Sequence, residues 1–308
     1  MEIFTQFTPT ISSLWEKALA REKNPYPFSP MSWHAHWFSH FGANETLSLV
    51  ADSAGSVILP LAVKDGVAHF TGGEEIADYL DAIGDDDTKL SLWQKALPAL
   101  KEQKATSLTL RNIPEGSPTL AYFRTVPGAD IAQEDTTPIL TLPDSFEGYL
   151  AALDRKDRHE LRRKMKKFEA THTDLIFSVR EHDAIRIDDL VLLMKQDTDK
   201  AIFLTPEMTE FFSGLPSVAP DSLRQFVLMA GEKIIAVTLA FQTRDALLLY
   251  NSGFDPQYPG AGWYIKVKTI AWAIEQKLTQ YNFLQGSERY KYDLGGKDFP
   301  VYKITLSL

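Results

Sequence analysis

The chain has 308 residues, no cysteine and a formal net charge of −9 at pH 7. This length suits two domains of ordinary size. The lack of cysteine excludes disulfides, thiolate metal sites and cysteine nucleophiles. The acidic balance argues against general affinity for nucleic acid. The first residues, MEIFTQFTPT, lack the basic and apolar regions of a signal peptide, and no uncharged apolar run approaches the roughly 18 residues of a membrane span. We therefore expect a cytoplasmic protein with no membrane span and no nucleic-acid partner; composition does not indicate its oligomeric state.

Patterns of strands and helices alternate through the first half. Apolar spacing and turn residues predict strands within 2–8, 46–52, 56–63, 67–72 and 107–113, and helices at 11–22, 29–41 and 89–103, the last bent near Pro98. Because strands and helices mix throughout, we expect an α+β or mixed α/β fold. Residues 114–137 are richer in Pro, Gly and Asp, which predicts one domain at 1–134 and a second at 135–308.

The second half repeats a similar order of elements. TPILTLP is a predicted strand, and a long helix with one apolar face follows, with Asp144 and Glu147 as its capping box. A strand, two short helices and then three strands joined by short turns come next, which favours an antiparallel meander. The chain ends with a glycine turn, a helix, a strand, a short polar-aromatic segment and the final strand VYKITLSL.

The glycine turn lies in the stretch FDPQYPGAGWYIKVKTIAWAIEQ. Gln257, Gly260 and Gly262 fit a Q-x-x-G-x-G pattern that follows a strand and opens an apolar-periodic helix. A helix N-terminus offers unpaired N–H groups and the positive end of the helix dipole to an anion, and glycine lets the ligand approach the backbone closely. The alternative is a plain strand-to-helix turn that uses glycine for its backbone angles. A Rossmann site is disfavoured because the preceding strands look antiparallel and a third glycine is absent.

This pattern after a meander strand resembles the pyrophosphate loop of the GNAT acyltransferases. The stretches PILTLPDSFEGYLAALDRKDRHELRRKMKKFE, IAWAIEQKLTQYNFLQGSERYKYDLGGKD and FTGGEEIADYLDAI resemble the CelD-type acetyltransferases of cellulose and exopolysaccharide biosynthesis, distant relatives of the Fem-type aminoacyltransferases. The resemblance implies two tandem GNAT-like domains with mixed, largely antiparallel sheets. In the second, Gln257, Gly260, Ala261 and Gly262 would hold the pyrophosphate of acyl-CoA. The loop is shorter than is usual in that family.

The resemblance also suggests where the chemistry takes place. In GNAT enzymes a tyrosine beyond the fifth strand often protonates the leaving thiolate, and Tyr290 and Tyr292 occupy that region. Glu288 or Asp293 is a candidate base, acting directly or through water, and Lys291 is a candidate contact for an anionic substrate or phosphate. The alternative is that the tyrosines have only packing or surface roles and that the lysine is solvated.

Residues 155–167, RKDRHELRRKMKK, are strongly basic inside an acidic chain. Arg158, Arg162 and Arg163 are candidates for contacts to phosphate or carboxylate on the acceptor, because guanidinium binds such groups in bidentate fashion. A solvated helix face is the alternative, and nucleic-acid binding is disfavoured by the net charge.

His36 and His40 would share a helix face, but no third ligand is placed by the sequence, so no metal site is expected. We predict an N-acyltransferase that moves an acyl group from acyl-CoA to an amine acceptor such as an amino sugar or a nucleotide-linked sugar. One alternative uses aminoacyl-tRNA as donor, as Fem-type enzymes do. The other is a non-catalytic binding protein in polysaccharide assembly, which the short loop favours.

Overall fold

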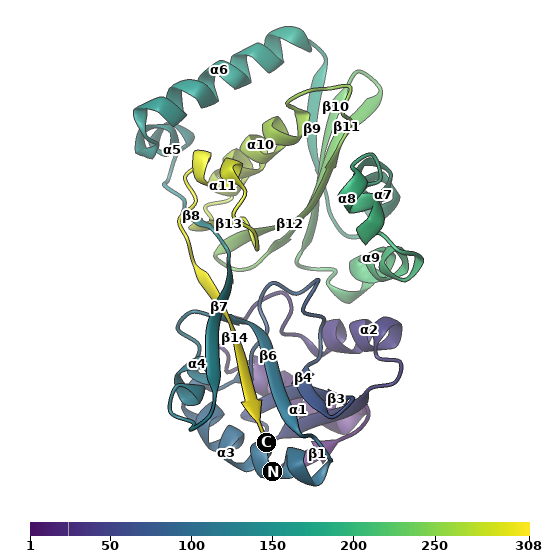
Figure 1. The fold of residues 1–308 in the computed structure, drawn as a ribbon. Coiled ribbons are helices and arrows are strands. Elements are labelled where there is room, and N and C mark those ends of the chain that lie inside the picture. Colours follow the sequence, from purple (N-terminus) through teal and green to yellow (C-terminus); the bar gives the residue numbers. More distant parts are fainter. Residues whose placement is uncertain (24) are drawn as a thin grey trace. The chain divides into compact units, whose positions relative to one another are not determined.

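The computed structural model describes residues 1–23 and 25–308, which form two compact units. Unit 1 comprises Met1–Thr136 together with Phe299–Leu308, and unit 2 comprises Thr137–Asp298. The chain therefore returns to unit 1 at its C-terminal end (Figure 1). The second domain predicted from the sequence, 135–308, instead includes residues 299–308.

Unit 1 contains a mixed sheet of eight strands among its described residues, with the path β1-β2-β3-β4-β6-β14-β7 and β5 paired to β3. The strands are β1 (Glu2–Phe4), β2 (Thr46–Ala51), β3 (Val57–Lys64), β4 (Val67–Phe70), β5 (Ile83–Gly84), β6 (Ser107–Pro114), β7 (Asp130–Thr136) and β14 (Pro300–Ser307). The helices are α1 (Pro9–Leu19), α2 (Met31–Phe41), α3 (Asp86–Glu102) and α4 (Pro118–Phe123). Strand β14 lies between β6 and β7 and pairs antiparallel with both, so the last strand of the chain completes the sheet of unit 1.

Unit 2 contains a six-stranded sheet among its described residues, in the order β8-β13-β12-β11-β10-β9. The strands are β8 (Ile139–Thr141), β9 (Leu175–Arg180), β10 (Leu223–Ala230), β11 (Lys233–Gln242), β12 (Ala246–Phe254) and β13 (Gln280–Asn282). The helices are α5 (Phe146–Ala152), α6 (Arg155–Thr171), η1 (His182–Ala184), α7 (Ile187–Met194), α8 (Thr198–Phe203), α9 (Pro206–Val218), α10 (Ala261–Glu275) and α11 (Arg289–Asp293). The predicted meander is confirmed, because β10, β11 and β12 pair antiparallel in succession.

The single long helix predicted after β8 is wrong. The backbone of Leu153 is extended, with φ −70° and ψ 149°, so the chain leaves α5 and begins again at α6. The leucine is buried in the core. The predicted cap at Asp144 is also wrong: Ser145 caps α5, and its hydroxyl accepts a hydrogen bond from the Gly148 amide at 3.0 Å. Aspartate and serine are both common N-cap residues, and in the structure the serine is the one that directly precedes the helix.

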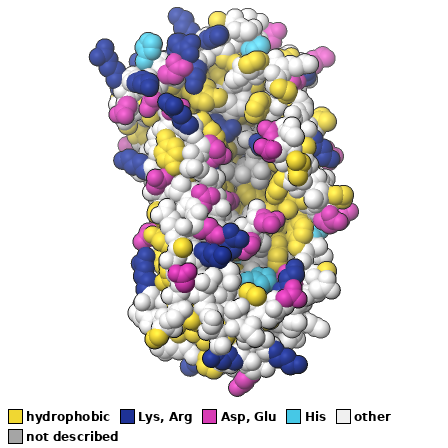
Figure 2. Space-filling model, in the orientation of Figure 1, with side chains coloured by type: hydrophobic (Ala, Val, Ile, Leu, Met, Phe, Trp, Pro, Cys, Tyr) yellow, Lys and Arg dark blue, Asp and Glu magenta, His cyan; other side chains and the backbone are white. Residues whose placement is uncertain are grey.

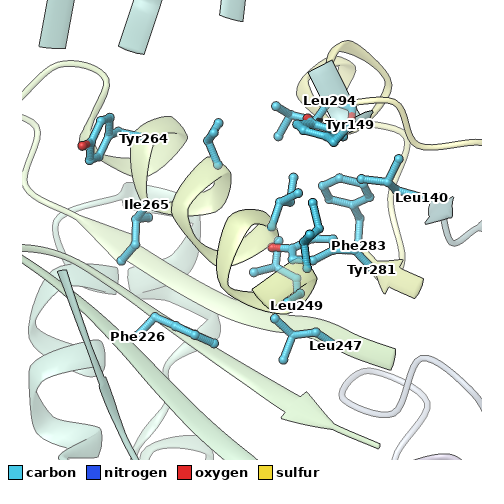
Figure 3. Packing of buried hydrophobic residues seen from close by; sticks show 14 of the residues in the cluster. Leu140, Tyr149, Phe226, Leu247, Leu249, Tyr264, Ile265, Tyr281, Phe283 and Leu294 are labelled. Atoms are coloured by element: carbon cyan, nitrogen blue, oxygen red, sulfur yellow. Dashed lines mark hydrogen bonds between the residues drawn. The ribbon is translucent and has the colours of Figure 1, made fainter. Parts of the chain in front are cut away.

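The core of unit 2 lies between its sheet and helices α5, α6 and α10. Figure 3 shows Tyr149 of α5 beside Leu294, whose carbonyl oxygen accepts a hydrogen bond from the tyrosine hydroxyl at 3.1 Å. Tyr281 and Phe283 follow the lower end of α10 and pack with Leu247 of β12 in the same cluster (Figure 3). This packing fixes α10 and the segment that leads to α11 against the sheet.

Two neighbouring residues of β12 show which helix covers which face. A Cβ on Gly253 would lie 2.6 Å from the amide nitrogen of Met194 at the end of α7. A Cβ on Gly262 of α10 would lie 2.6 Å from the ring of Phe254. Successive strand residues point to opposite faces, so α7 and α10 cover opposite faces of the sheet (Figure 1).

Strand β12 is irregular where it passes α10. Leu239 pairs with Asn251 but Ala240 pairs with Leu249, so Tyr250 is the extra residue of a bulge. Strand β13 runs parallel to β12 and pairs with it only over Ala246–Leu248. The remaining length of β12 has no β13 partner among the described residues, so this edge of β12 is not paired by β13.

Within residues 1–23 and 25–308, no helix has both the length and the apolar character needed to cross a membrane.

Candidate functional site

Backbone conformation and packing explain why both Gly260 and Gly262, at the start of α10, are glycine. Gly260 is the residue that precedes the helix and has φ +98°, a left-handed conformation that glycine adopts without strain. Gly262 lies against the ring of Phe254, where a side chain would collide. The plain-turn explanation therefore accounts for the two glycines, and evidence for a ligand must come from what surrounds them.

The first turn of α10 presents free donors. The Ala261 amide donates to the Tyr258 carbonyl oxygen at 3.0 Å. In the described part of the chain, the amides of Gly262 and Trp263 have no hydrogen-bond partner. The indole N–H of Trp263 is also buried without a partner there. These donors lie at the positive end of a helix of 15 residues, which favours an anion.

A groove of about 550 Å³ adjoins this helix start. Its lining comes from α6 and from the turn and first residues of α10: Arg163, Lys164, Lys167, Phe168, Thr171, His172, Gln257, Pro259, Gly260 and Trp263. Lys164 also covers the ring of Trp263, with its Nζ 5.2 Å from the ring centroid. Figure 2 shows Lys and Arg side chains gathered over the region where α6 runs. The groove thus combines lysine charge with the start of a helix, where Trp263 lines the hollow.

A second hollow, of about 330 Å³, also has Trp263 in its lining. It is lined by Lys156, Asp157, Glu160, Leu161, Lys164, Trp263, Arg289 and Asp293. Because Lys164 and Trp263 line both hollows, the two are neighbours along the α6 and α10 surface. This gives an elongated ligand room to continue past the start of α10.

The structure separates the three predicted arginines. Arg163 lines the larger groove, where its guanidinium donates to both carboxylate oxygens of Glu160 at 2.7 and 2.8 Å. This hydrogen-bonded pairing lowers the pKa of Glu160 to about 2. Arg158 instead donates to the Ala151 carbonyl oxygen at 3.2 Å. Arg158 and Arg162 line neither hollow described above.

Lys164 and Lys167 line the groove and were not singled out from the sequence. The run of positive charge in the sequence drew attention to α6 as a whole. Which of its lysines line the groove beside the glycine turn depends on how α6 packs on α10. Among the residues predicted to hold the pyrophosphate, Gln257 and Gly260 line the groove. Ala261 and Gly262 are buried at the start of the helix.

The predicted catalytic segment, at α11, forms a second group of polar residues. Lys291 is 2% exposed, and its Nζ lies 2.9 Å from a carboxylate oxygen of Glu288. The same ammonium donates to the carbonyl oxygens of Leu284 at 3.0 Å and Gly286 at 3.1 Å, and to that of Gln285. Lys291 therefore holds the loop that precedes α11, a different use from the substrate contact predicted for it.

The two candidate tyrosines have different surroundings. The Tyr292 hydroxyl donates to a carboxylate oxygen of Asp298 at 2.6 Å. The ring of Tyr290 packs on the core and lies under the Nζ of Lys266, 4.9 Å from the ring centroid. Burial, with a smaller contribution from Glu288, raises the pKa of Tyr290, so its phenol stays protonated at neutral pH. The phenol therefore has a proton to donate, while its burial also makes it a weaker acid than an exposed tyrosine.

Lys266, which was not singled out from the sequence, lies beside Tyr290, and Lys200 lies near Lys266. Lys266 of α10 is 8% exposed, and Lys200 of α8 is half-buried. Burial, followed by the charge of neighbouring Lys200, lowers the pKa of Lys266 to about 7. A lysine whose pKa lies near neutrality is uncommon and marks a candidate functional site.

The histidines of α2 do not form part of either group. His34 is buried, and its Nδ1 lies 2.8 Å from the Thr71 hydroxyl, while the rings of His36 and His40 contact each other at 4.5 Å between centroids. Over the residues that the structure describes, no group of three or more His, Asp or Glu side chains is arranged to hold a metal ion.

Comparison with known proteins identifies the kind of domain. The family profile described as "Acetyltransferase (GNAT) domain" matches residues 155–292, most of unit 2. The chain is also similar to L-PGS from Bacillus licheniformis, with a TM-score of 0.67 at 14% identity over 99% of this chain and 94% of that one. The similarity to FemX has a TM-score of 0.64 at 11% identity and covers 100% of this chain and 98% of that one. The similarity to a tandem GNAT protein from the clavulanic acid biosynthesis pathway has a TM-score of 0.53 at 13% identity and covers 98% of this chain and 96% of that one. No curated protein sequence matches the chain significantly.

These findings confirm two predictions. The fold is a mixed α and β arrangement of two GNAT-like domains in tandem, and the enzyme class is an acyltransferase. At these identities the similarity to solved structures concerns the fold alone.

Proposed function

We propose that unit 2 is an N-acyltransferase that takes an acyl group, such as acetyl, from acyl-CoA and passes it to an amine. The observation that carries the proposal is the groove at the start of α10, where Lys164 and Lys167 line the same hollow as Gly260 and Trp263, next to helix amides that have no hydrogen-bond partner in the described chain. Pyrophosphate carries concentrated negative charge, and such donors and cations bind it together. The GNAT domain match over residues 155–292 supports the same choice of donor.

The chemistry assigned to the α11 segment is a simple acyl transfer. The amine nitrogen attacks the thioester carbonyl carbon and loses a proton to Glu288, directly or through water. The carbon–sulfur bond then breaks, and the leaving thiolate takes a proton from the Tyr290 hydroxyl. The pKa of this phenol is raised by burial, so it is protonated when the thiolate leaves. Glu288 is more than half exposed, so an amine can reach it from solvent.

The acceptor class follows the family resemblance. The CelD-type pattern favours an amino sugar or a nucleotide-linked sugar, with polysaccharide assembly as the setting. Arg158, Arg162 and Arg163 on α6 remain the proposed contacts to phosphates of such an acceptor, and Arg163 also lines the groove assigned to the donor. An acyl-CoA donor and a chain without cysteine both fit the predicted cytoplasmic location.

The test is a calorimetric titration of acetyl-CoA and coenzyme A into the wild-type protein and into a Lys164→Met, Lys167→Met double variant. We expect micromolar-range binding by wild type and a loss of roughly tenfold or more in the variant, since each phosphate contact from a cation contributes on the order of 1 kcal/mol. The matched control is Lys166→Met, a change on an exposed lysine of the same helix that lines neither hollow. A well-folded wild-type protein that binds neither compound would overturn the choice of donor.

A second candidate keeps the fold and changes the donor to an aminoacyl group carried by tRNA. The observation in its favour is that L-PGS and FemX resemble this chain over both units more closely than the tandem GNAT protein does, with TM-scores of 0.67 and 0.64 against 0.53. Incubation with radiolabelled aminoacyl-tRNA and an amine acceptor, followed by loss of label from the tRNA, would distinguish it. Transfer from aminoacyl-tRNA together with no binding of acetyl-CoA would favour this second candidate.

A further inference from the structure

Two lysines converge on one residue at the open edge of β12. Lys200 Nζ donates to the Ser252 carbonyl oxygen at 2.6 Å, and Lys266 Nζ lies 3.3 Å from the Ser252 hydroxyl oxygen. Lys266 also donates to the Gly262 carbonyl oxygen at 3.0 Å. Ser252 belongs to the part of β12 that has no pairing with β13 in the described chain, so its carbonyl binds a lysine where a strand would otherwise pair.

The charges around this point do not balance. Among the described residues, no carboxylate lies within 4 Å of the ammonium of Lys200 or Lys266. The nearest carboxylate on the neighbouring α11 segment, that of Glu288, pairs with Lys291. Asp197 and Glu288 act on Lys200 only as more distant negative charges. Three lysines thus gather about one carboxylate. The hydrogen bonds of Lys200 and Lys266 go only to neutral oxygen atoms, and Lys266 also lies over the ring of Tyr290.

Such an arrangement is costly without an anionic partner. A buried ammonium loses its hydration and is stable only when it is paired or loses its proton. The lysines are also not needed to satisfy the first turn of α10, because the Gly262 carbonyl oxygen belongs to the helix and has its own partner one turn later. Helical positions beside a sheet are ordinarily filled by apolar residues, as most of α10 is. The lysine pair is therefore best explained by a ligand.

We propose that Lys200, Lys266 and the Ser252 hydroxyl form a subsite for an oxyanion, a carboxylate or a phosphate, carried by the acyl acceptor. The anion-binding part of this proposal stands on the geometry alone, and its assignment to the acceptor rests on the proposed function. The site is distinct from the groove at Lys164 and Lys167, because none of its three members lines either hollow. It lies beside Tyr290, so an anion held there places the rest of the acceptor next to the candidate proton donor.

Protonation gives this subsite a measurable signature. The groups that face Lys266 are Lys200, Glu288, Tyr290 and Lys291. Burial lowers the pKa of Lys266 to about 7, with Lys200 as the next cause. An oxyanion bound next to it favours the charged form and raises that pKa again, so binding takes up a proton near neutral pH. Affinity then falls as the pH rises through and above 7.

The experiment uses a reference protein that carries Lys164→Met and Lys167→Met, which removes the anion contacts of the groove. Sulfate, a dianion whose charge is constant over the range, and acetate, a carboxylate, are titrated calorimetrically at about pH 6.5 and about pH 8.5. We expect binding to weaken roughly tenfold at the higher pH, because the protonated fraction of a group with a pKa near 7 falls by at least that factor. Buffers of different ionisation enthalpy should reveal proton uptake. Preference for sulfate indicates a phosphate-bearing acceptor, and preference for acetate a carboxylate.

Lys266→Met added to the reference protein should abolish both the binding and the proton uptake. Lys200→Met, at a half-buried position on a helix surface, keeps the test decisive if the Lys266 variant fails to fold, and should weaken binding at least tenfold. Binding that is unaffected by either change, or that does not vary with pH, would overturn the subsite. Coenzyme A binding to the wild-type protein is measured in parallel. If coenzyme A binds but sulfate and acetate do not bind as expected, only the subsite is rejected. If sulfate or acetate binds as expected but coenzyme A does not bind, only the choice of acyl-CoA as donor is rejected.

Discussion

The ammonium of Lys266 on α10 lies over the ring of Tyr290 on α11, 4.9 Å from the ring centroid. Burial has opposite consequences for these two groups. It raises the pKa of the phenol and lowers the pKa of the lysine to about 7, because in each case the neutral form is favoured. At neutral pH the tyrosine keeps its proton while the lysine is poised to gain or lose one.

The first prediction concerns the proton donor. Tyr290→Phe keeps the ring in the core and removes the hydroxyl, so we expect kcat for acetyl transfer to fall about 100-fold with little change in KM for acetyl-CoA. Steady-state kinetics with an amine acceptor measures both constants. Tyr292→Phe is the matched change two residues away, where the hydroxyl is bound to Asp298. Equal losses in the two variants would contradict the assignment to Tyr290.

A second prediction follows from the lowered pKa of Lys266. In the unfolded chain a lysine titrates near 10.4, so between pH 7 and that value the unfolded state binds more protons than the folded state. The contribution of Lys266 to the free energy of unfolding therefore rises with pH, by at most about 1.4 kcal/mol per pH unit for one proton. We expect Lys266→Met to be more stable than wild type at about pH 6, with the difference shrinking toward about pH 9. Urea unfolding of both proteins across this range provides the measurement, and a difference that does not vary with pH would contradict the lowered pKa.

The sequence was sufficient for the meander and for the helix after the glycine turn, because both depend on local apolar periodicity and turn residues. It was insufficient for β14. VYKITLSL has the pattern of a strand, but no local property says that it pairs with β6 and β7 of the first unit. The break between α5 and α6 was missed for a similar reason, since apolar residues keep helical spacing across the extended backbone at Leu153.

The candidate site shows the same division. The sequence directed attention to the segments around Gly260 and Tyr290, because glycine before a helix and polar aromatics near the C-terminus have recognisable patterns. Lys200 and Lys266 lie 66 positions apart in sequence and come together only through Ser252. A lysine in an apolar helix is a visible irregularity, and Lys266 within GWYIKVKTIAW is such a signal.

The third prediction separates the two glycines of the turn. Gly262→Ala places a Cβ 2.6 Å from the ring of Phe254, so the ring or the helix must move, at a cost of roughly 1–3 kcal/mol of stability. Gly260→Ala meets Phe168 only at an ordinary 3.5 Å but forces a residue with a side chain to φ +98°, which costs about 1–2 kcal/mol. Urea unfolding measures both losses.

Gly260→Glu extends this test to binding. At the exposed Gly260 position the added carboxylate repels an anionic ligand in the groove, so coenzyme A affinity should fall well beyond the change seen for Gly260→Ala. Calorimetric titration compares the two variants directly. Equal affinities would indicate that the ligand's phosphates lie elsewhere.

The last prediction tests the C-terminal strand. Ile304 of β14 is fully buried in unit 1, so Ile304→Ala should lower the free energy of unfolding by about 2–5 kcal/mol. The control is Ser307→Ala, at an exposed position of the same strand. Four of the six tryptophans, Trp15, Trp33, Trp37 and Trp93, belong to unit 1, so intrinsic fluorescence during urea unfolding reports mainly on that unit. Because β14 lies between β6 and β7, its loss would leave both strands without a partner on that side. Removal of residues 299–308 should therefore abolish the cooperative transition of unit 1, and an unchanged transition in the truncated protein would contradict the pairing of β14 with this sheet.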